Sequence, residues 1–176
     1  MDKKYLLFEY LVFRLDEWKK QLNNTNKIQL SKLRLQKILF LVCACGATKD
    51  NFKLLNIFDN FSALPYGPVE IDIYEAMKRD NAFEHLHFIK NGCVYKDLNE
   101  SMFETISKDE RGWIDDAIQK FKDEGKEYLT MPVFDLVEIT HKWTVWSISM
   151  DIAELLGKKQ MKMSAEEICD SLNKAF

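Results

Sequence analysis

Apolar residues recur three and four positions apart in several segments of this chain, and that spacing restricts its fold more than any other feature. Between Lys4 and Leu22 it runs through Phe8, Leu11, Val12, Leu15, Trp18 and Leu22. The pattern predicts a helix with one broad apolar face, ended by Asn23 and Asn24. A second helix is expected from an N-cap at Ser31 to a stop at Gly46. Its expected buried stripe is Leu35, Ile38, Leu39, Val42 and Cys45.

Capping signals place the helices of the second half of the chain. Ser107–Glu110 and Ser164–Glu167 both have the Ser-x-x-Glu spacing of a capping box. Pro132 is predicted to start a helix that leads to His141, and a helix near Ile148–Leu156 is expected to stop at Gly157. The helix after Ser107 has an apolar face made of Trp113, Ile114, Ala117, Ile118 and Phe121.

The middle of the chain is less regular. Residues 53–64 are rich in Phe and Leu, and we interpret them as a broken helix. Gly67-Pro68 predicts a new helix with proline at its first position, ending near Asp80. In this helix Val69, Ile73, Ala76 and Met77 are expected to face the core, and Glu70, Asp72 and Lys78 to face water. Lys90-Asn91-Gly92 lies between two short apolar runs and predicts a β-hairpin with a type I′ turn.

These elements together predict a mainly α fold. We expect a compact single-domain helical bundle of about six to eight helices with one small β-hairpin insert, formed by residues 1–176 as one domain. The chain has 176 residues and is 47% apolar, so one core is sufficient. No internal repeat, low-complexity segment or Pro/Gly linker divides it.

Charge and composition narrow the function classes. The formal charge is −3 and the basic residues are dispersed, so nucleic-acid binding is unsupported. The longest apolar run, about Ile38–Ala47, is shorter than the roughly 20 residues that cross a bilayer, which predicts that the chain does not insert into a membrane. Glu9 interrupts what would be a signal-peptide core, so we expect a cytoplasmic protein. The four cysteines have no framework spacing and are predicted to be reduced, two of them in the core.

Several residues could carry chemistry, and each also has a plainer interpretation. His85 and His87 would share one face of a strand, with Cys93 across the hairpin, but further ligands at metal-site spacing are missing. Two histidines on an exposed hairpin are therefore the favoured interpretation. Asp109, Glu110, Asp115 and Asp116 are interpreted as a solvated helix face.

His141 is the one candidate general base, because imidazole titrates near neutral pH. Its sequence neighbours Thr140, Lys142 and Trp143 supply neither a nucleophile motif nor a positioned carboxylate. The favoured alternative is structural: His141 bonds a backbone carbonyl and holds the turn that leads to Trp146. Likewise, Tyr66-Gly67-Pro68-Val69 resembles no phosphate loop. It is interpreted as a tight turn before a helix, or as a rigid turn that presents Tyr66 to a partner.

Three segments in order resemble the Panacea domain, the family of SocA-like, often phage-associated antitoxins. They are Leu33–Phe40, which contains Leu-Gln-Lys; Ala63–Tyr74, which contains Gly-Pro-Val; and Thr140-His141 followed after four residues by Trp146. Met163–Ile168 is similar to the start of the family's closing helix. Leu64-Pro65-Tyr66 and Val145 depart from the family pattern.

The resemblance implies a protein that neutralises a toxin from a neighbouring gene by binding it in a bacterial or prophage-encoded system. It implies no enzyme activity, cofactor or metal, and it leaves the oligomeric state open. Two alternatives stand beside it: a proteolytic adaptor or interaction module, for which a protease is a further partner, and a small hydrolase using His141. The signature residues, with a structural role favoured over partner binding, are Gln36, Lys37, Tyr66, Gly67, Pro68, Val69, Tyr74, Thr140, His141 and Trp146.

Overall fold

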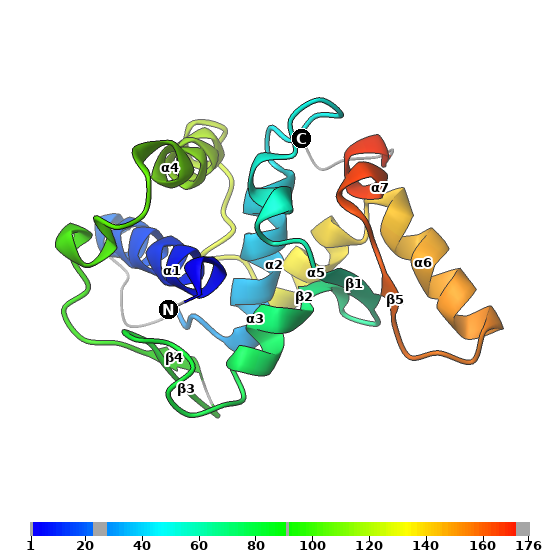
Figure 1. Cartoon of the computed structure of the whole chain (residues 1–176), viewed down its shortest axis with the longest axis horizontal. Helices are drawn as coiled ribbons and strands as arrows, with labels where there is room; N and C mark the ends of the chain where they lie inside the picture. The colour runs from blue at the N-terminus through cyan, green and yellow to red at the C-terminus, as the bar shows by residue number, and fades with distance from the viewer. Residues whose placement is uncertain (1, 23–27, 91, 172–176) are drawn as a thin grey trace.

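One helix, α2 (Lys32–Ala44), runs through the middle of the molecule, and the other elements are arranged around it (Figure 1). This computed structural model describes residues 2–22, 28–90 and 92–171. All ten residues from Leu35 to Ala44 are buried. The expected single buried stripe on this helix is therefore wrong, because α5, β2, α4 and α1 contact α2 on different sides.

On one side of α2 lie α1 (Lys3–Gln21), α4 (Lys108–Asp123) and the hairpin of β3 (His87–Ile89) and β4 (Gly92–Val94) (Figure 1). The predicted face of α1 is buried except at Leu22, which is exposed. The side-chain oxygen of Ser107 caps α4 as predicted. The hairpin is confirmed by the pairing of Phe88 with Cys93. Asn23, Asn24 and Asn91, to which we assigned a helix end and a turn, lie outside the described residues.

A second sheet, which the sequence did not predict, lies on the other side of α2. Strand β1 (Phe61–Leu64) pairs antiparallel with β2 (Gly67–Glu70) and with β5 (Met161–Lys162), in the order β2-β1-β5. The predicted broken helix over residues 53–64 is correspondingly a short 3-10 helix, η2 (Lys53–Asn56), followed by strand β1. A second 3-10 helix, η3 (Glu100–Phe103), precedes α4.

The predicted helix start at Gly67-Pro68 is wrong. Both residues belong to β2, and α3 (Ile71–Ala76) begins only after Glu70, whose carboxylate accepts a hydrogen bond from the Ile73 N–H. Proline is compatible with this strand because β2 is at the edge of the sheet, where a missing N–H leaves no partner strand unpaired. Glu70, expected to face water, is fully buried.

Three helices complete the chain: α5 (Val133–Thr140), α6 (Thr144–Leu155) and α7 (Ala165–Asp170). Pro132 is the N-cap residue of α5, and Ser164 and Glu167 form the predicted capping box of α7. Gly157 follows α6 with φ +62°, the left-handed conformation expected at a helix stop. Helix α6 packs on β1 and β5, and α5 packs on α2 and β2.

The prediction of a mainly α fold is confirmed, with seven α-helices among the described residues and the predicted small hairpin beside the additional sheet. The four cysteines are free thiols, and Cys43 and Cys169 are buried, as expected. None of the helices in the described parts of the chain is both long and apolar enough to cross a membrane.

Candidate functional site

Most of the predicted signature residues meet where α2 crosses β2 and the junction of α5 with α6. Gln36 and Lys37 come from α2, Gly67, Pro68 and Val69 from β2, and Thr140, His141 and Trp146 from the α5–α6 junction. We call these eight residues the signature cluster. Segments far apart in the sequence are joined there mainly by side-chain hydrogen bonds to backbone atoms, since side chains of α2 replace the strand that β2 lacks on its outer edge.

The side-chain amide of Gln36 forms hydrogen bonds with both the backbone N–H and the backbone carbonyl of Glu70. The Glu70 N–H donates to Gln36 Oε1 at 2.9 Å, and Gln36 Nε2 donates to the Glu70 carbonyl at 3.4 Å. A neighbouring β-strand would satisfy an edge in the same way. The side chain is buried, so these backbone groups have no easy access to water.

Lys37 makes the next contact along β2. Its Nζ donates to the Pro68 carbonyl at 2.5 Å, and the residue has no exposed surface. Burial lowers the pKa of Lys37 to about 7, because an ammonium group away from water is costly unless a negative charge compensates it. A lysine at this position therefore serves the fold as a hydrogen-bond donor more than as a charge.

Gly67 is required by the close approach of these groups. Its φ is +90°, and a Cβ at this position would lie 2.5 Å from Thr140 Oγ1 and 3.0 Å from Lys37 Nζ. A larger residue would require the side chains of Thr140 and Lys37, or β2 itself, to shift, and its backbone would be strained at this φ. The hydroxyl of Thr140 itself donates to the Val137 carbonyl at 2.8 Å.

His141 and Trp146 connect the start of α6 to strand β1. The two rings stack with centroids 3.6 Å apart and planes inclined by 11°, and Trp146 Nε1 donates to the Leu64 carbonyl at 2.9 Å. Burial lowers the pKa of His141, and the nearby Lys37 lowers it further, whereas Glu138 opposes the shift. Glu138 Oε1 lies 3.7 Å from His141 Nδ1 and is largely exposed.

Two signature residues lie outside the cluster. The Tyr66 ring is 61% exposed and meets the 59% exposed ring of Phe134 edge-on, at a centroid distance of 6.1 Å. Tyr74 lies on α3, where the Lys78 ammonium sits 3.9 Å from its ring centroid. Phe134, on α5, is therefore a surface residue.

Sequence reasoning missed an acidic group next to the cluster. Asp59, Glu70 and Asp72 have carboxylate oxygens within 4.8 Å of one another, the spacing of a possible metal site among the described residues. The Lys4 ammonium lies 2.6–2.9 Å from all three carboxylates and occupies the position that a metal ion would take. Burial alone would lower the pKa of Lys4, but the three carboxylates raise it above its ordinary value. Lys4 and Glu70 are 66 residues apart, so local patterns cannot reveal this contact.

A second buried carboxylate, Glu9, lies under the hairpin. Its Oε1 accepts the His85 N–H at 2.7 Å, and burial raises its pKa. The His85 ring packs edge-on against Phe103. Within the described residues, His85, His87 and Cys93 do not form a group with metal-ligand spacing.

The acidic run on α4 is only partly a solvated face. Glu110 pairs with Lys3, while Asp115 accepts hydrogen bonds from the Tyr10 hydroxyl and pairs with Arg14 Nε at 2.8 Å. These contacts tie α4 to α1. They give Glu110 and Asp115 a structural role.

Comparison with known proteins gives one match. The family model described as antitoxin SocA-like, Panacea domain, matches residues 35–147, which is more than half of the chain. The matched span begins on α2 and ends in the first turn of α6, and it contains all ten predicted signature residues. No curated protein and no solved structure shows a significant match. The chain therefore belongs to the SocA-like antitoxin family that is defined by the Panacea domain.

Proposed function

We propose that this protein is an antitoxin that neutralises a partner toxin by direct protein–protein binding, without catalysis. The observation that carries the proposal is the family match over residues 35–147. The partner is a toxin encoded by a neighbouring gene, and the complex forms in the cytoplasm of a bacterium.

The contacts of the signature cluster support a binding protein. The polar side-chain atoms of Gln36, Lys37 and Trp146 form hydrogen bonds with backbone groups of other segments. Such contacts fix the relative positions of α2, the sheet and α6, so the surface is arranged before a partner arrives. A preorganised surface loses less conformational freedom on binding.

Exposed apolar side chains are the second support. Tyr66 and Phe134 form one exposed aromatic pair, and Ile148, Leu155 and Leu156 are exposed on or just after α6. A few aromatic or aliphatic anchors of this kind supply most of the free energy of protein–protein binding.

The hydrolase alternative has weaker support. The fold does bring a carboxylate, Glu138, close to His141, but Trp146 stacks on the imidazole and the Thr140 hydroxyl donates to a backbone carbonyl. A base at His141 would need a nucleophile and a substrate on the same side of the ring. Apart from Glu138, no described contact of His141 favours that role, and none favours a protease adaptor.

Co-expression tests the proposal. The neighbouring gene product is induced in bacteria with or without this protein, and growth, complex formation on affinity purification and the intact mass of the partner are measured. We expect the partner alone to stop growth, and this protein to restore growth in a stable complex with a partner of unchanged mass. A partner that is harmless alone, or remains toxic when co-expressed, contradicts the proposal; a shortened partner half-life indicates the adaptor function.

A further inference from the structure

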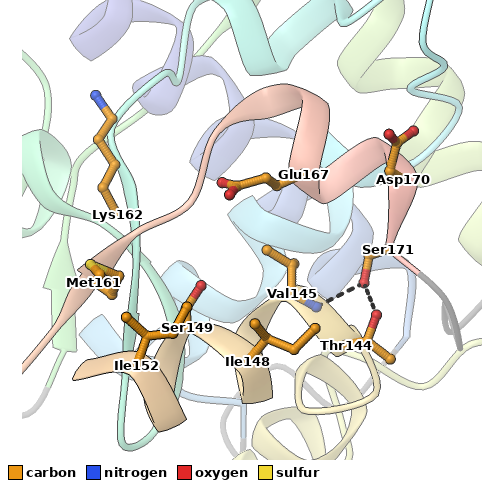
Figure 2. Close-up of a pocket in the computed structure, with 10 residues that line it drawn as sticks. All are labelled: Thr144, Val145, Ile148, Ser149, Ile152, Met161, Lys162, Glu167, Asp170 and Ser171. Carbon is orange, nitrogen blue, oxygen red and sulfur yellow. Dashed lines mark hydrogen bonds between the residues drawn. The ribbon is translucent and has the colours of Figure 1, made fainter. Parts of the chain in front are cut away.

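A groove between α6 and the β5–α7 segment takes no part in the signature cluster (Figure 2). Its volume is about 340 Å³. It lies on a different face of α6 from Trp146, because side chains two positions apart on a helix, such as Trp146 and Ile148, point about 160° apart. The lining residues are Thr144, Val145, Ile148, Ser149, Ile152, Met161, Lys162, Glu167, Asp170 and Ser171.

The α6 wall of the groove is apolar and partly uncovered. Ile148 is 57% exposed and Ile152 39% exposed, and Leu155, at 86%, extends the same stripe by one turn. The spacing of four and three places all three side chains along one face of the helix. A stripe of this kind, adjoining a concave surface, is typical of a protein–protein contact.

Polar groups at the end of the groove already have partners within the chain. The Ser171 hydroxyl accepts the Val145 N–H at 3.1 Å and lies 3.1 Å from Thr144 Oγ1, as Figure 2 shows. Glu167 Oε2 accepts the Ser164 N–H in the capping box of α7. The groove therefore offers apolar contact between fixed walls more than hydrogen-bonding groups for a small polar ligand.

The charge of the two helices indicates the chemistry of the occupant. Between them α6 and α7 contain five acidic residues and no Lys or Arg: Asp151, Glu154, Glu166, Glu167 and Asp170. All five are exposed. Lys49 pairs with Asp170 at 3.0 Å, and Lys158, Lys159 and Lys162 lie on the segment that joins α6 to α7, so the excess of acidic side chains is confined to the two helices themselves. A segment with basic residues beside an apolar stripe complements this surface.

We infer that the groove binds an amphipathic helix of the partner whose apolar residues are spaced three and four apart and flanked by Lys or Arg. This inference rests on the proposed antitoxin function and names the surface that performs it. The family match ends at residue 147, so Ile148, Ile152, β5 and α7 lie outside the span that the family model covers. A partner-specific surface can vary there without changing the residues that the family model covers.

Two synthetic peptides test the groove without the toxin. One is a leucine-striped helix about four turns long with lysine flanks, and the other has the same stripe with glutamate flanks. Binding to the full chain is measured by fluorescence anisotropy at low and high salt. We expect the lysine peptide to bind at least about tenfold more tightly, a difference of ~1.4 kcal/mol, and to lose most of this preference at high salt.

Three variants locate the binding. Ile148→Asp places a charge on the groove wall and should weaken the lysine peptide about tenfold or more. Ile89→Asp is the matched control, because Ile89 is 53% exposed on the β3–β4 hairpin, away from the groove, and should leave binding unchanged. Asp170→Lys should weaken the lysine peptide and strengthen the glutamate peptide. Equal binding of the lysine peptide to wild type and Ile148→Asp at equal melting temperature, or its failure to bind, overturns the inference.

The same variants with the neighbouring gene product separate this inference from the proposed function. If wild type and Ile89→Asp bind the partner and Ile148→Asp does not, both stand. If all three bind it and Tyr66→Ala does not, the exposed aromatic pair is the docking surface, so the groove inference fails and the antitoxin function stands. If wild type binds the lysine peptide in the groove but never the gene product, the antitoxin function fails, while the specificity of the groove for a lysine-flanked helix stands.

Discussion

The side-chain amide of Gln36 pairs with both the N–H and the carbonyl of Glu70, so a single residue of α2 takes the place of a neighbouring strand on the outer edge of β2. The same Glu70 caps α3 through its carboxylate and binds the Lys4 ammonium. One buried glutamate thus joins the sheet, the start of α3 and the start of α1. Because several elements meet at Glu70, we expect substitutions of the residues that bind it to destabilise the fold.

Gln36→Leu keeps the volume of the side chain and removes its hydrogen bonds. Two buried backbone groups of Glu70 then lack partners, and we expect the free energy of unfolding to fall by about 2–4 kcal/mol. Urea denaturation followed by circular dichroism measures the change. Gln29→Leu is the control, since Gln29 is exposed. Equal stability of the two variants would show that the Gln36 pairing adds nothing to the fold.

Gly67→Ala should be more damaging than an ordinary glycine substitution. The added Cβ would lie 2.5 Å from Thr140 Oγ1 in a backbone with φ +90°, and we expect a loss of about 2 kcal/mol or more. Gly112→Ala is the opposite control: Gly112 lies within α4 with no atom within 4 Å of the added Cβ, so alanine should stabilise the protein by about 0.5–1 kcal/mol. Melting temperatures of both variants give the comparison.

The double variant Gly67→Ala/Thr140→Ala identifies the cause. Removing the Thr140 side chain relieves the close contact but not the backbone strain, so the double variant should lose less stability than the sum of the two single variants. Strict additivity would mean that the contact with Thr140 adds nothing to the cost of Gly67→Ala, which then comes from the backbone conformation and from the 3.0 Å approach to Lys37 Nζ.

The local signals in the sequence were enough to place most helices but not the sheet. Ser31, Ser107, Ser164 and Gly157 act within one turn of a helix, and the structure uses each of them as expected. Strand β5 has two residues and pairs with β1 about a hundred positions earlier in the chain, so no short window contains its partner. Pro68 fits a helix start equally well by local preference; contacts with α2 decide in favour of a strand.

In the candidate site, too, the sequence identified residues but not the distant contacts that they make. The resemblance identified the signature residues, but their roles depend on partners 31–82 positions away, such as Pro68 for Lys37 and Leu64 for Trp146. The periodicity of α2 indicated one buried stripe and so placed Gln36 and Lys37 outside it. Only the packing of helices and the sheet on several sides of α2 explains why two polar residues are in the interior.

The burial of Lys37 predicts a pH dependence of stability. Its pKa is lowered to about 7 in the folded protein from the model-peptide value of 10.5. Between these two pH values the unfolded chain binds a proton that the folded chain does not, so the folded state gains stability as the pH rises through this window; below about pH 7 the effect levels off. Each pH unit contributes up to ~1.4 kcal/mol.

Urea denaturation of wild type and Lys37→Met at pH 7, 8 and 9 measures this contribution. The difference in unfolding free energy, wild type minus variant, should rise with pH, because methionine has no proton to release. Lys90→Met, at an exposed position of the hairpin, is the matched control. A difference that stays constant from pH 7 to pH 9 would show that Lys37 keeps its proton in the folded protein.

Trp146→Phe separates a structural role of the signature cluster from a role in partner binding. Phenylalanine keeps a ring against His141 but loses the hydrogen bond from Nε1 to the Leu64 carbonyl, so we expect a loss of about 1–2 kcal/mol in stability. Trp113→Phe, at a half-buried position on α4, controls for the smaller ring. If the cluster only holds the scaffold, the folded fraction of Trp146→Phe binds the partner with unchanged affinity once urea curves correct for unfolding. Weaker binding at an unchanged melting temperature would instead place Trp146 in the interface, because a residue that acts only through stability cannot weaken binding while the melting temperature stays the same.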